Sequence, residues 1–273
     1  MSHVIKKSRT SGKKPTIKKI AFCAFLVLFA ISSYKFLGGK LENRRAEKSY
    51  AEIQMSVRQT EYQKAAEKLV EEEAPEEVSE KPKEHVISMD FTPLKEVNQD
   101  IIAWIRAEGT NIDYPVTLTD NNDFYLTHLY NREENVFGSI FMDCRCKSDF
   151  SDRNSVIYGH HMQNGTMFAT LAEYKSQDFY DANPTMTICT PDGDYTLELI
   201  CGTIEDGNNE FVRFYFDNDE DFLDYINGFR ERSNFVSDVE LNPDDRVVSL
   251  CTCTYEQMNA RYMVIGRLVP VLA

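Results

Sequence analysis

Three patterns of apolar and polar residues follow one another along the chain, and the first is a long apolar run near the N-terminus. No charged side chain occurs from Ile20 to Tyr34, and the apolar character continues past Lys35 to Gly39. Roughly 20 residues are enough for a helix to cross a bilayer when one lysine reaches toward the interface. We therefore predict a transmembrane signal anchor over residues 20–39.

Basic residues ahead of this run set its predicted orientation. Residues 1–19 contain seven Lys/Arg and no Asp/Glu, and such a tail stays in the cytoplasm by the positive-inside rule. A cleaved signal peptide would begin in much the same way, but a clear A-x-A cleavage site is missing. The pattern favours a single-pass protein of the cell membrane, with residues 1–19 as a basic cytoplasmic tail and the C-terminal domain extracellular.

The second pattern is a mixed-charge segment with little apolar periodicity. Residues 41–70 have high helix propensity, whereas residues 71–84 are acidic and contain two prolines. This composition predicts a solvated helical stalk and an extended acidic linker, together spanning residues 40–84. A folded domain is expected over residues 85–273.

The third pattern fills that domain with short β-type runs. It opens with a helix-like spacing of apolar residues over 93–109, which predicts an amphipathic helix. A later helical spacing, over 217–235, lies between the sixth and seventh runs. Eight runs predict an all-β barrel or sandwich. They cover residues 111–118, 136–143, 154–161, 185–190, 195–205, 211–216, 246–253 and 261–272.

Charge is distributed unevenly and excludes one class of partner. The first 48 residues contain twelve Lys/Arg and two Asp/Glu, a charge of +10. Because the net charge of the whole chain is −14, the other 225 residues carry −24. Binding to nucleic acid requires clustered Lys and Arg on the folded part. The acidic domain therefore argues against a nucleic-acid-binding protein.

Seven cysteines occur, six of them outside the apolar run. They lack the spacing of a small disulfide-rich domain, and the pairs Cys144/Cys146 and Cys251/Cys253 have one intervening residue where zinc knuckles have two to four. We predict no metal and no cofactor. Cys189 and Cys201 lie between apolar neighbours and are expected to be core residues.

Cys253 stands at the end of a β-type run and precedes a polar loop, after which the last run begins with Arg261. A guanidinium near a thiol favours the reactive thiolate. His160 and His161 likewise follow the apolar run that ends at Gly159, where an imidazole could exchange protons near neutral pH. The sequence thus offers a thiol, an imidazole and a guanidinium at strand ends.

These residues resemble the motifs of a known family. The stretch Ser249–Cys253 followed by Arg261 is similar to the T-L-x-T-C signature and downstream arginine of sortases, with Ser249 at the first Thr position and Cys251 at the variable one. Tyr158–Met162, together with the Gly-Thr-Met-Phe of 165–168, resembles the histidine segment of class B sortases. The resemblance covers roughly residues 93–269.

Membership of this family would imply an eight-stranded sortase barrel with an N-terminal helical addition and a helix between strands six and seven. It implies a cysteine transpeptidase that cleaves the C-terminal sorting motif of surface proteins after Thr. The acyl group would pass to an amine of peptidoglycan or its lipid-linked precursor, or to water in slow hydrolysis. Cys253 would be the nucleophile, His160 the acid and base, and Arg261 the substrate and oxyanion clamp, with Cys251 and Thr252 contacting the substrate.

The acid and base could in principle be either imidazole of the pair. Adjacent residues of an extended strand point to opposite faces, so only one can approach Cys253. The resemblance favours His160, with His161 as a packing or hydrogen-bonding residue behind it. A carboxylate partner for His160 stays open among Asp143, Asp149 and Asp152.

Two other classes are weighed against this one. A papain-like protease has its cysteine at a helix start and its histidine far downstream, whereas here the histidine comes 93 residues before the cysteine. A non-catalytic surface adhesin or pilus-anchoring domain would explain the anchor, the stalk and the β-fold. It would not need a Cys, a His and an Arg at strand ends.

Overall fold

A computed structural model describes residues 17–71, 85–253 and 259–273 of the chain, without the side chains of residues 17–20, 23, 64–71 and 253. The basic tail before residue 17, the acidic linker and the side chain of Cys253 therefore lie outside the described part. The chain divides into two compact units, Met1–Arg45 and Ala46–Ala273.

The described part of the N-terminal unit is the first part of helix α1 (Ile17–Glu71). A window of mean hydropathy 1.4 makes this helix long and apolar enough to cross a membrane. Large apolar side chains along it, such as Phe25 and Leu28, are about two-thirds exposed, at 62% and 67%. This is consistent with the predicted membrane anchor.

The later part of α1 belongs to the second unit. Ala46, Tyr50, Ile53 and Val57 are buried and join the core of the domain, at a spacing that forms one stripe along a helix. The predicted helix is confirmed, but the expectation of a solvated stalk is wrong for this segment. Only four apolar residues form this stripe and many charged residues surround them, so the hydrophobic periodicity was too weak to predict a buried face.

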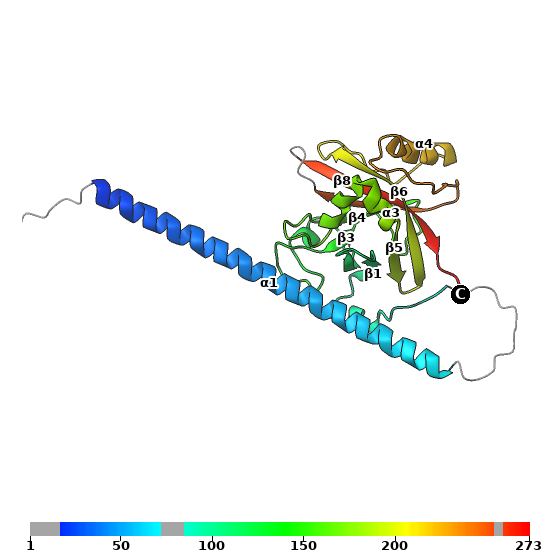
Figure 1. Ribbon diagram of the computed structural model, residues 1–273, viewed down its shortest axis with the longest axis horizontal. Helices are drawn as coiled ribbons and strands as arrows, with labels where there is room; N and C mark the ends of the chain where they lie inside the picture. The colour runs from blue at the N-terminus through cyan, green and yellow to red at the C-terminus, as the bar shows by residue number, and fades with distance from the viewer. Residues whose placement is uncertain (1–16, 72–84, 254–258) are drawn as a thin grey trace, which may run out of the picture. The chain divides into compact units, whose positions relative to one another are not determined.

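Eight strands close into a barrel in the order β1-β2-β3-β4-β7-β8-β6-β5, which confirms the predicted fold (Figure 1). The β2–β3 and β4–β7 pairs are parallel and the other pairs are antiparallel. The strands are β1 Ile101–Arg106, β2 Asp113–Thr117, β3 Ile140–Met142, β4 Asn154–Gly159, β5 Thr185–Thr190, β6 Gly193–Asp206, β7 Val247–Cys253 and β8 Ala260–Pro270.

The predicted helix over 93–109 is wrong in its second half. Helix α2 covers only Thr92–Val97, because Asn98 adopts an extended conformation, and residues 101–106 form β1. β1 pairs with a strand on each side and is buried along nearly its whole length. A strand buried on both faces has no polar alternation, so its apolar run is hard to tell from a helix.

The predicted strand over 211–216 is also wrong, since this segment is irregular. Its backbone is satisfied by side chains: Asn154 donates to the Arg213 carbonyl over 2.8 Å, and Tyr225 donates to that of Phe211 over 3.2 Å. The aromatic ring of Phe216 packs on helix α4 (Asp219–Arg230) against Phe222. Aromatic residues here serve helix packing instead of strand pairing.

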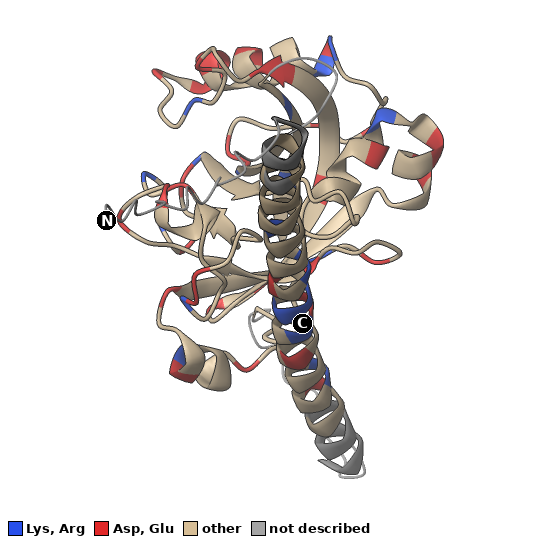
Figure 2. Ribbon diagram, turned by 90° about the vertical axis from the view of Figure 1, so that its left-hand side faces the viewer, with Lys and Arg blue, Asp and Glu red and all other residues tan. Residues whose placement is uncertain are grey.

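Helix α4 (Asp219–Arg230) lies between β6 and β7, as predicted. The Asn218 side chain caps it by accepting from the Asp221 amide over 2.9 Å, and its first turn is acidic. Acidic residues are widely spread over the loops and helices around the barrel (Figure 2). Three short helices were not predicted: η1 Phe124–Leu126, η2 Ala169–Lys175 and α3 Gln177–Ala182.

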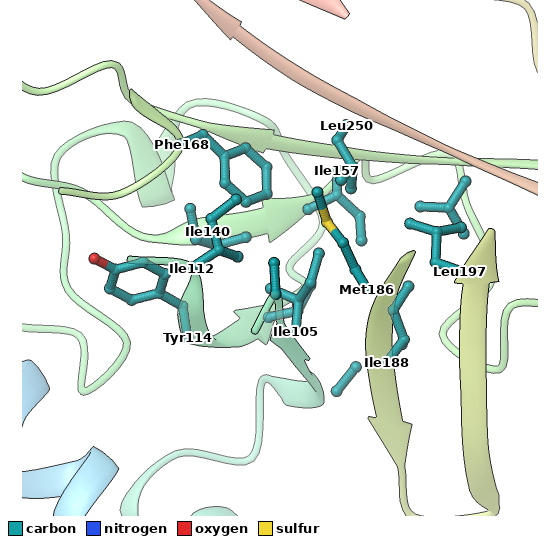
Figure 3. Packing of buried hydrophobic residues seen from close by; sticks show 14 of the residues in the cluster. Ile105, Ile112, Tyr114, Ile140, Ile157, Phe168, Met186, Ile188, Leu197 and Leu250 are labelled. Atoms are coloured by element: carbon teal, nitrogen blue, oxygen red, sulfur yellow. The ribbon is translucent and has the colours of Figure 1, made fainter. Parts of the chain in front are cut away.

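The barrel interior is filled by branched and aromatic side chains from most of the strands (Figure 3). Ile105, Ile140, Ile157, Ile188 and Leu250 are fully buried there. Such packing fixes the strand register, because a slip by one residue would turn each apolar side chain outward. The positions of the strand ends follow from this register.

Candidate active site

Strand register brings the three sequence motifs to one end of the barrel. In the parallel β4–β7 pair, Gly159 lies opposite Thr252, so His160 follows directly beside the end of β7. In the antiparallel β7–β8 pair, the backbone of Cys253 lies opposite Arg261. Residues separated by about a hundred positions in the sequence therefore become neighbours.

A cavity of about 280 Å³ opens at this end of the barrel. Among its walls are His160 and Arg261, and also Cys251 and Thr252. Most of the other wall residues carry no motif signal in the sequence. They come from the loop around η1, from β3 and from the end of β4. The described lining consists of Asn122, Asp123, Leu126, Phe141, Tyr158, Gly159, His160, Cys251, Thr252 and Arg261.

The His160 imidazole is half-buried, and its Nε2 lies 2.7 Å from the carbonyl oxygen of Leu126. A carbonyl can only accept a hydrogen bond, so Nε2 carries a proton and Nδ1 is the nitrogen that can exchange one. The residue before it, Gly159, is closely packed: a Cβ there would lie 2.4 Å from Cδ1 of Ile140 and 2.7 Å from the Phe168 ring. The close packing of β3 against β4 thus delivers the imidazole to the cavity.

None of the three aspartates proposed as partners of His160 is recorded in contact with it. Asp143 is engaged by Arg145, Asp149 accepts from the Ser151 amide, and Asp152 accepts from the Lys147 amide. The partner of His160 is the backbone carbonyl of Leu126. Every residue has such a carbonyl, so the sequence could not identify it.

His161 faces a different environment. Its backbone forms an isolated bridge with Met167, and the residue lines a second cavity beside Gly109 and Glu173. The two histidines therefore line separate cavities, as the alternation of an extended chain requires.

Arg261 is half-buried at the start of β8. Its Nη1 lies 3.2 Å from the Ala260 carbonyl and 3.4 Å from that of Asn259. Among the described residues no carboxylate lies within ion-pair distance of this guanidinium. Within the described part of the chain, its Nε and Nη2 donors have no hydrogen-bond partner.

Thr252 and Cys251 form the inner wall, and both are 2% exposed. The Thr252 hydroxyl donates to the Gly159 carbonyl over 2.8 Å and so joins the end of β7 to the end of β4. This contact holds the histidine-bearing and cysteine-bearing strands together. Cys251 lies opposite Tyr158 in the register.

A buried polar network supports the wall behind Tyr158. The fully buried Asp143 carboxylate accepts from Arg145 over 2.8 Å, from Tyr158 over 3.1 Å and from Asn122 over 3.0 Å. Burial alone would raise the pKa of Asp143, but hydrogen bonds and the charge of Arg145 outweigh it and hold the pKa below its usual value. The network fixes two cavity residues, Asn122 and Tyr158, from behind.

Three other cysteines are buried away from this cavity, and burial is the main cause of the raised pKa of each thiol. The pKa values of Cys146, Cys189 and Cys201 lie at about 12, so these thiols stay protonated at neutral pH. Cys189 and Cys201 are core residues, as the sequence predicts.

Known proteins similar to this chain belong to one family. Sortase B of Listeria monocytogenes is 34% identical over 178 residues, which are 64% of this chain and 72% of the relative. Sortase B of Staphylococcus aureus is 28% identical over 258 residues, 94% of this chain and 97% of the relative. No protein-family model matches the chain.

Solved structures agree with these relatives. The crystal structure of Staphylococcus aureus sortase B matches with a TM-score of 0.70 at 27% identity, over 82% of this chain and 98% of that one. Clostridium perfringens sortase B matches with a TM-score of 0.63 at 37% identity, over 66% and 100%. The sequence similarity and the similarity of the barrel point to the same family, and the chain belongs to the sortase B family of cysteine transpeptidases.

Proposed function

We propose that this sortase cleaves a C-terminal sorting motif of surface proteins after threonine and joins the acyl group to an amine of peptidoglycan or its lipid-linked precursor. The observation that carries the proposal is the strand register. It sets His160, the end of β7 and Arg261 around one cavity. The family supports the transpeptidase class, and one related structure is a Staphylococcus aureus sortase B-substrate complex.

In the proposed first step, the Cys253 thiolate attacks the threonine carbonyl carbon and the C–N bond breaks. Protonated His160 gives its Nδ1 proton to the departing amine, because its Nε2–H remains bonded to Leu126. The products are a thioester on Cys253 and a free amine. Arg261 donates to the oxyanion that forms between these events.

The second step reverses the roles. The acceptor amine attacks the thioester, His160 takes a proton from it at Nδ1, and the thiolate leaves as a new amide bond forms. Water in place of the amine would give slow hydrolysis. The position of Arg261 in the cavity wall supports its assignment as the clamp, and the wall position of Cys251 and Thr252 supports contact with the sorting peptide.

We also propose the arrangement of the chain at the membrane. The basic tail 1–19 would lie in the cytoplasm, the anchor would occupy residues 20–39, and the rest would lie outside the cell. The apolar composition of α1 supports the anchor. The catalytic domain proposed for 85–273, after the stalk and linker of 40–84, gains the segment 46–57 from α1, because that segment packs in the same compact unit.

Incubation with a small peptide library tests the proposal. Peptides carrying Asn-Pro-x-Thr, Ser-Pro-x-Thr and Leu-Pro-x-Thr, each with an added amine acceptor, are analysed by mass. The proposal predicts cleavage after threonine and transfer to the amine for one class of motif. Absence of both products with every peptide, from protein shown to be folded, would contradict it.

A further inference from the structure

The segment before β3 holds the turn that contacts His160. The turn is η1, and the carbonyl of its last residue, Leu126, accepts from the imidazole over 2.7 Å. Ser139 fixes the turn at two points: its amide donates to the Tyr125 carbonyl over 2.8 Å, and its hydroxyl donates to that of His128 over 2.9 Å. The position of Leu126 therefore depends on the segment that precedes β3.

Gly138 brings this segment into direct contact with the imidazole. Its φ of +59° is one that glycine adopts without strain. A Cβ here would lie 2.8 Å from the Leu126 carbonyl and 3.0 Å from Cδ2 of His160. Gly138 thus packs against both members of the His160–Leu126 hydrogen bond, and a shift of its backbone would disturb that bond.

Helix α1 holds Gly138 in turn. Tyr50 is 4% exposed, and its hydroxyl donates to the Gly138 carbonyl over 2.8 Å. Its ring meets the ring of Tyr114 edge-on, with centroids 5.2 Å apart, and packs against Tyr130 at the same distance. Because the ring is buried between Tyr114 and Tyr130, the direction of the Tyr50 hydroxyl toward the Gly138 carbonyl is fixed.

The same face of α1 contacts the loop on the other side of His160. Glu47, three residues before Tyr50, accepts from the Asn164 side chain over 2.7 Å. Asn164 belongs to the loop after β4 that returns to the histidine, where the Phe168 amide donates to the His160 carbonyl over 3.0 Å. This second contact is exposed and contributes less than the buried one.

We infer that Tyr50 is a positioning residue for the transpeptidase reaction, acting through Gly138 and Leu126 on the orientation and tautomer of His160. The segment of α1 around Tyr50 is then part of the active-site architecture. The inference rests on the acid and base role proposed for His160. Tyr50 itself touches neither substrate nor reacting atoms.

The experiment compares Tyr50→Phe with Tyr130→Phe in the full chain in detergent. Each change removes one hydroxyl from the interface between α1 and the domain and keeps the ring. The Tyr130 hydroxyl bonds to the Ser49 carbonyl over 3.0 Å and lies 3.0 Å from the Ser49 hydroxyl, so its described hydrogen bonds go to the helix and not to Gly138, Ser139 or η1. Losses of melting temperature should therefore be similar for the two variants.

Steady-state transfer kinetics with a cleavable sorting peptide provide the first readout. Tyr50→Phe should lower kcat by about fivefold to twentyfold with KM changed by less than about twofold, because orientation of the acid is lost and peptide binding is kept. Tyr130→Phe should keep kcat within about twofold. Ser139→Ala, which removes the hydroxyl contact to the His128 carbonyl two residues after the turn, should lower kcat as Tyr50→Phe does.

Nitrogen NMR of histidine-labelled protein gives a second readout that does not depend on turnover. Five histidines are present, and His160→Gln assigns the His160 signal. The unchanged chain should show the Nε2–H tautomer, and Tyr50→Phe a mixture of both tautomers. Equal kcat and equal tautomers in Tyr50→Phe and Tyr130→Phe would overturn the inference, whereas full turnover in His160→Gln would overturn the proposed function instead.

Discussion

Arg261 carries the most specific chemical claim at the scale of single residues. Arg261→Lys should lower the rate of peptide cleavage at least about a hundredfold although the charge is kept, or roughly 2.7 kcal/mol of barrier. A guanidinium offers a planar fork of donors to the substrate backbone and the oxyanion, whereas an ammonium is a single hydrated charge. The loss is measured by quenching reactions with a sorting peptide at fixed times and quantifying the cleaved peptide by mass spectrometry.

Alkylation by iodoacetamide serves as the control for Arg261→Lys. If the variant still folds, Cys253 should react at a rate close to that of the unchanged chain. Near-normal turnover in Arg261→Lys would reject the clamp role and leave only an electrostatic effect on the thiol.

Asp143 links a single carboxylate to the pH dependence of stability. Its folded-state pKa is depressed, so its contribution is present above the unfolded pKa of about 4 and is lost as pH falls through the folded pKa. Asp143→Asn should therefore cost about 1–3 kcal/mol of unfolding free energy at pH 7 and less at pH 3. Urea unfolding at both pH values measures this, and an equal loss at the two would contradict the ionic role.

Among the elements, the later part of α1 has the largest expected effect on stability. It buries Tyr50, Ile53 and Val57, and each such side chain contributes about 1.5–3 kcal/mol. The sum is comparable with the whole stability of a domain, about 5–15 kcal/mol. Deleting residues 1–40 should leave a folded and active protein, whereas deleting residues 1–84 should lower the melting temperature by more than about 10 °C. Equal melting curves for the two truncations would refute this role.

Element by element, local apolar spacing was enough to predict seven of the eight strands and helix α4. The alternation in residues 195–205 and the helical spacing of Phe222, Ile226 and Phe229 correctly predicted β6 and α4. It failed at β1, which is buried on both faces, and at 211–216, where aromatic rings pack on a helix. These two errors offset each other in the strand count.

At the scale of the whole molecule, the residues proposed for chemistry could be predicted and their supports could not. Thr252 and Arg261 carry side-chain signals at strand ends, and the register brings them to the cavity that His160 also lines. The Leu126 carbonyl and the Tyr50 hydroxyl act through backbone contacts of long sequence separation. Such contacts arise from the closed barrel and have no local pattern.

The membrane arrangement is testable on intact cells. The full-length chain should fractionate with membranes, because residues 20–39 can span a bilayer. Protease added to protoplasts should degrade the C-terminal part, since the positive tail keeps only the N-terminus inside. Protection of residues 41–273 would overturn the proposed orientation.

Trapping of the acyl-enzyme tests the central claim most directly. The chain is mixed with a cleavable sorting peptide without acceptor, quenched in acid, and its peptides are sequenced by mass spectrometry. The account predicts a thioester on Cys253, no adduct in Cys253→Ala, and activity within about tenfold of normal in Cys251→Ala. A thioester on Cys251, or cleavage by folded Cys253→Ala, would contradict the proposed mechanism.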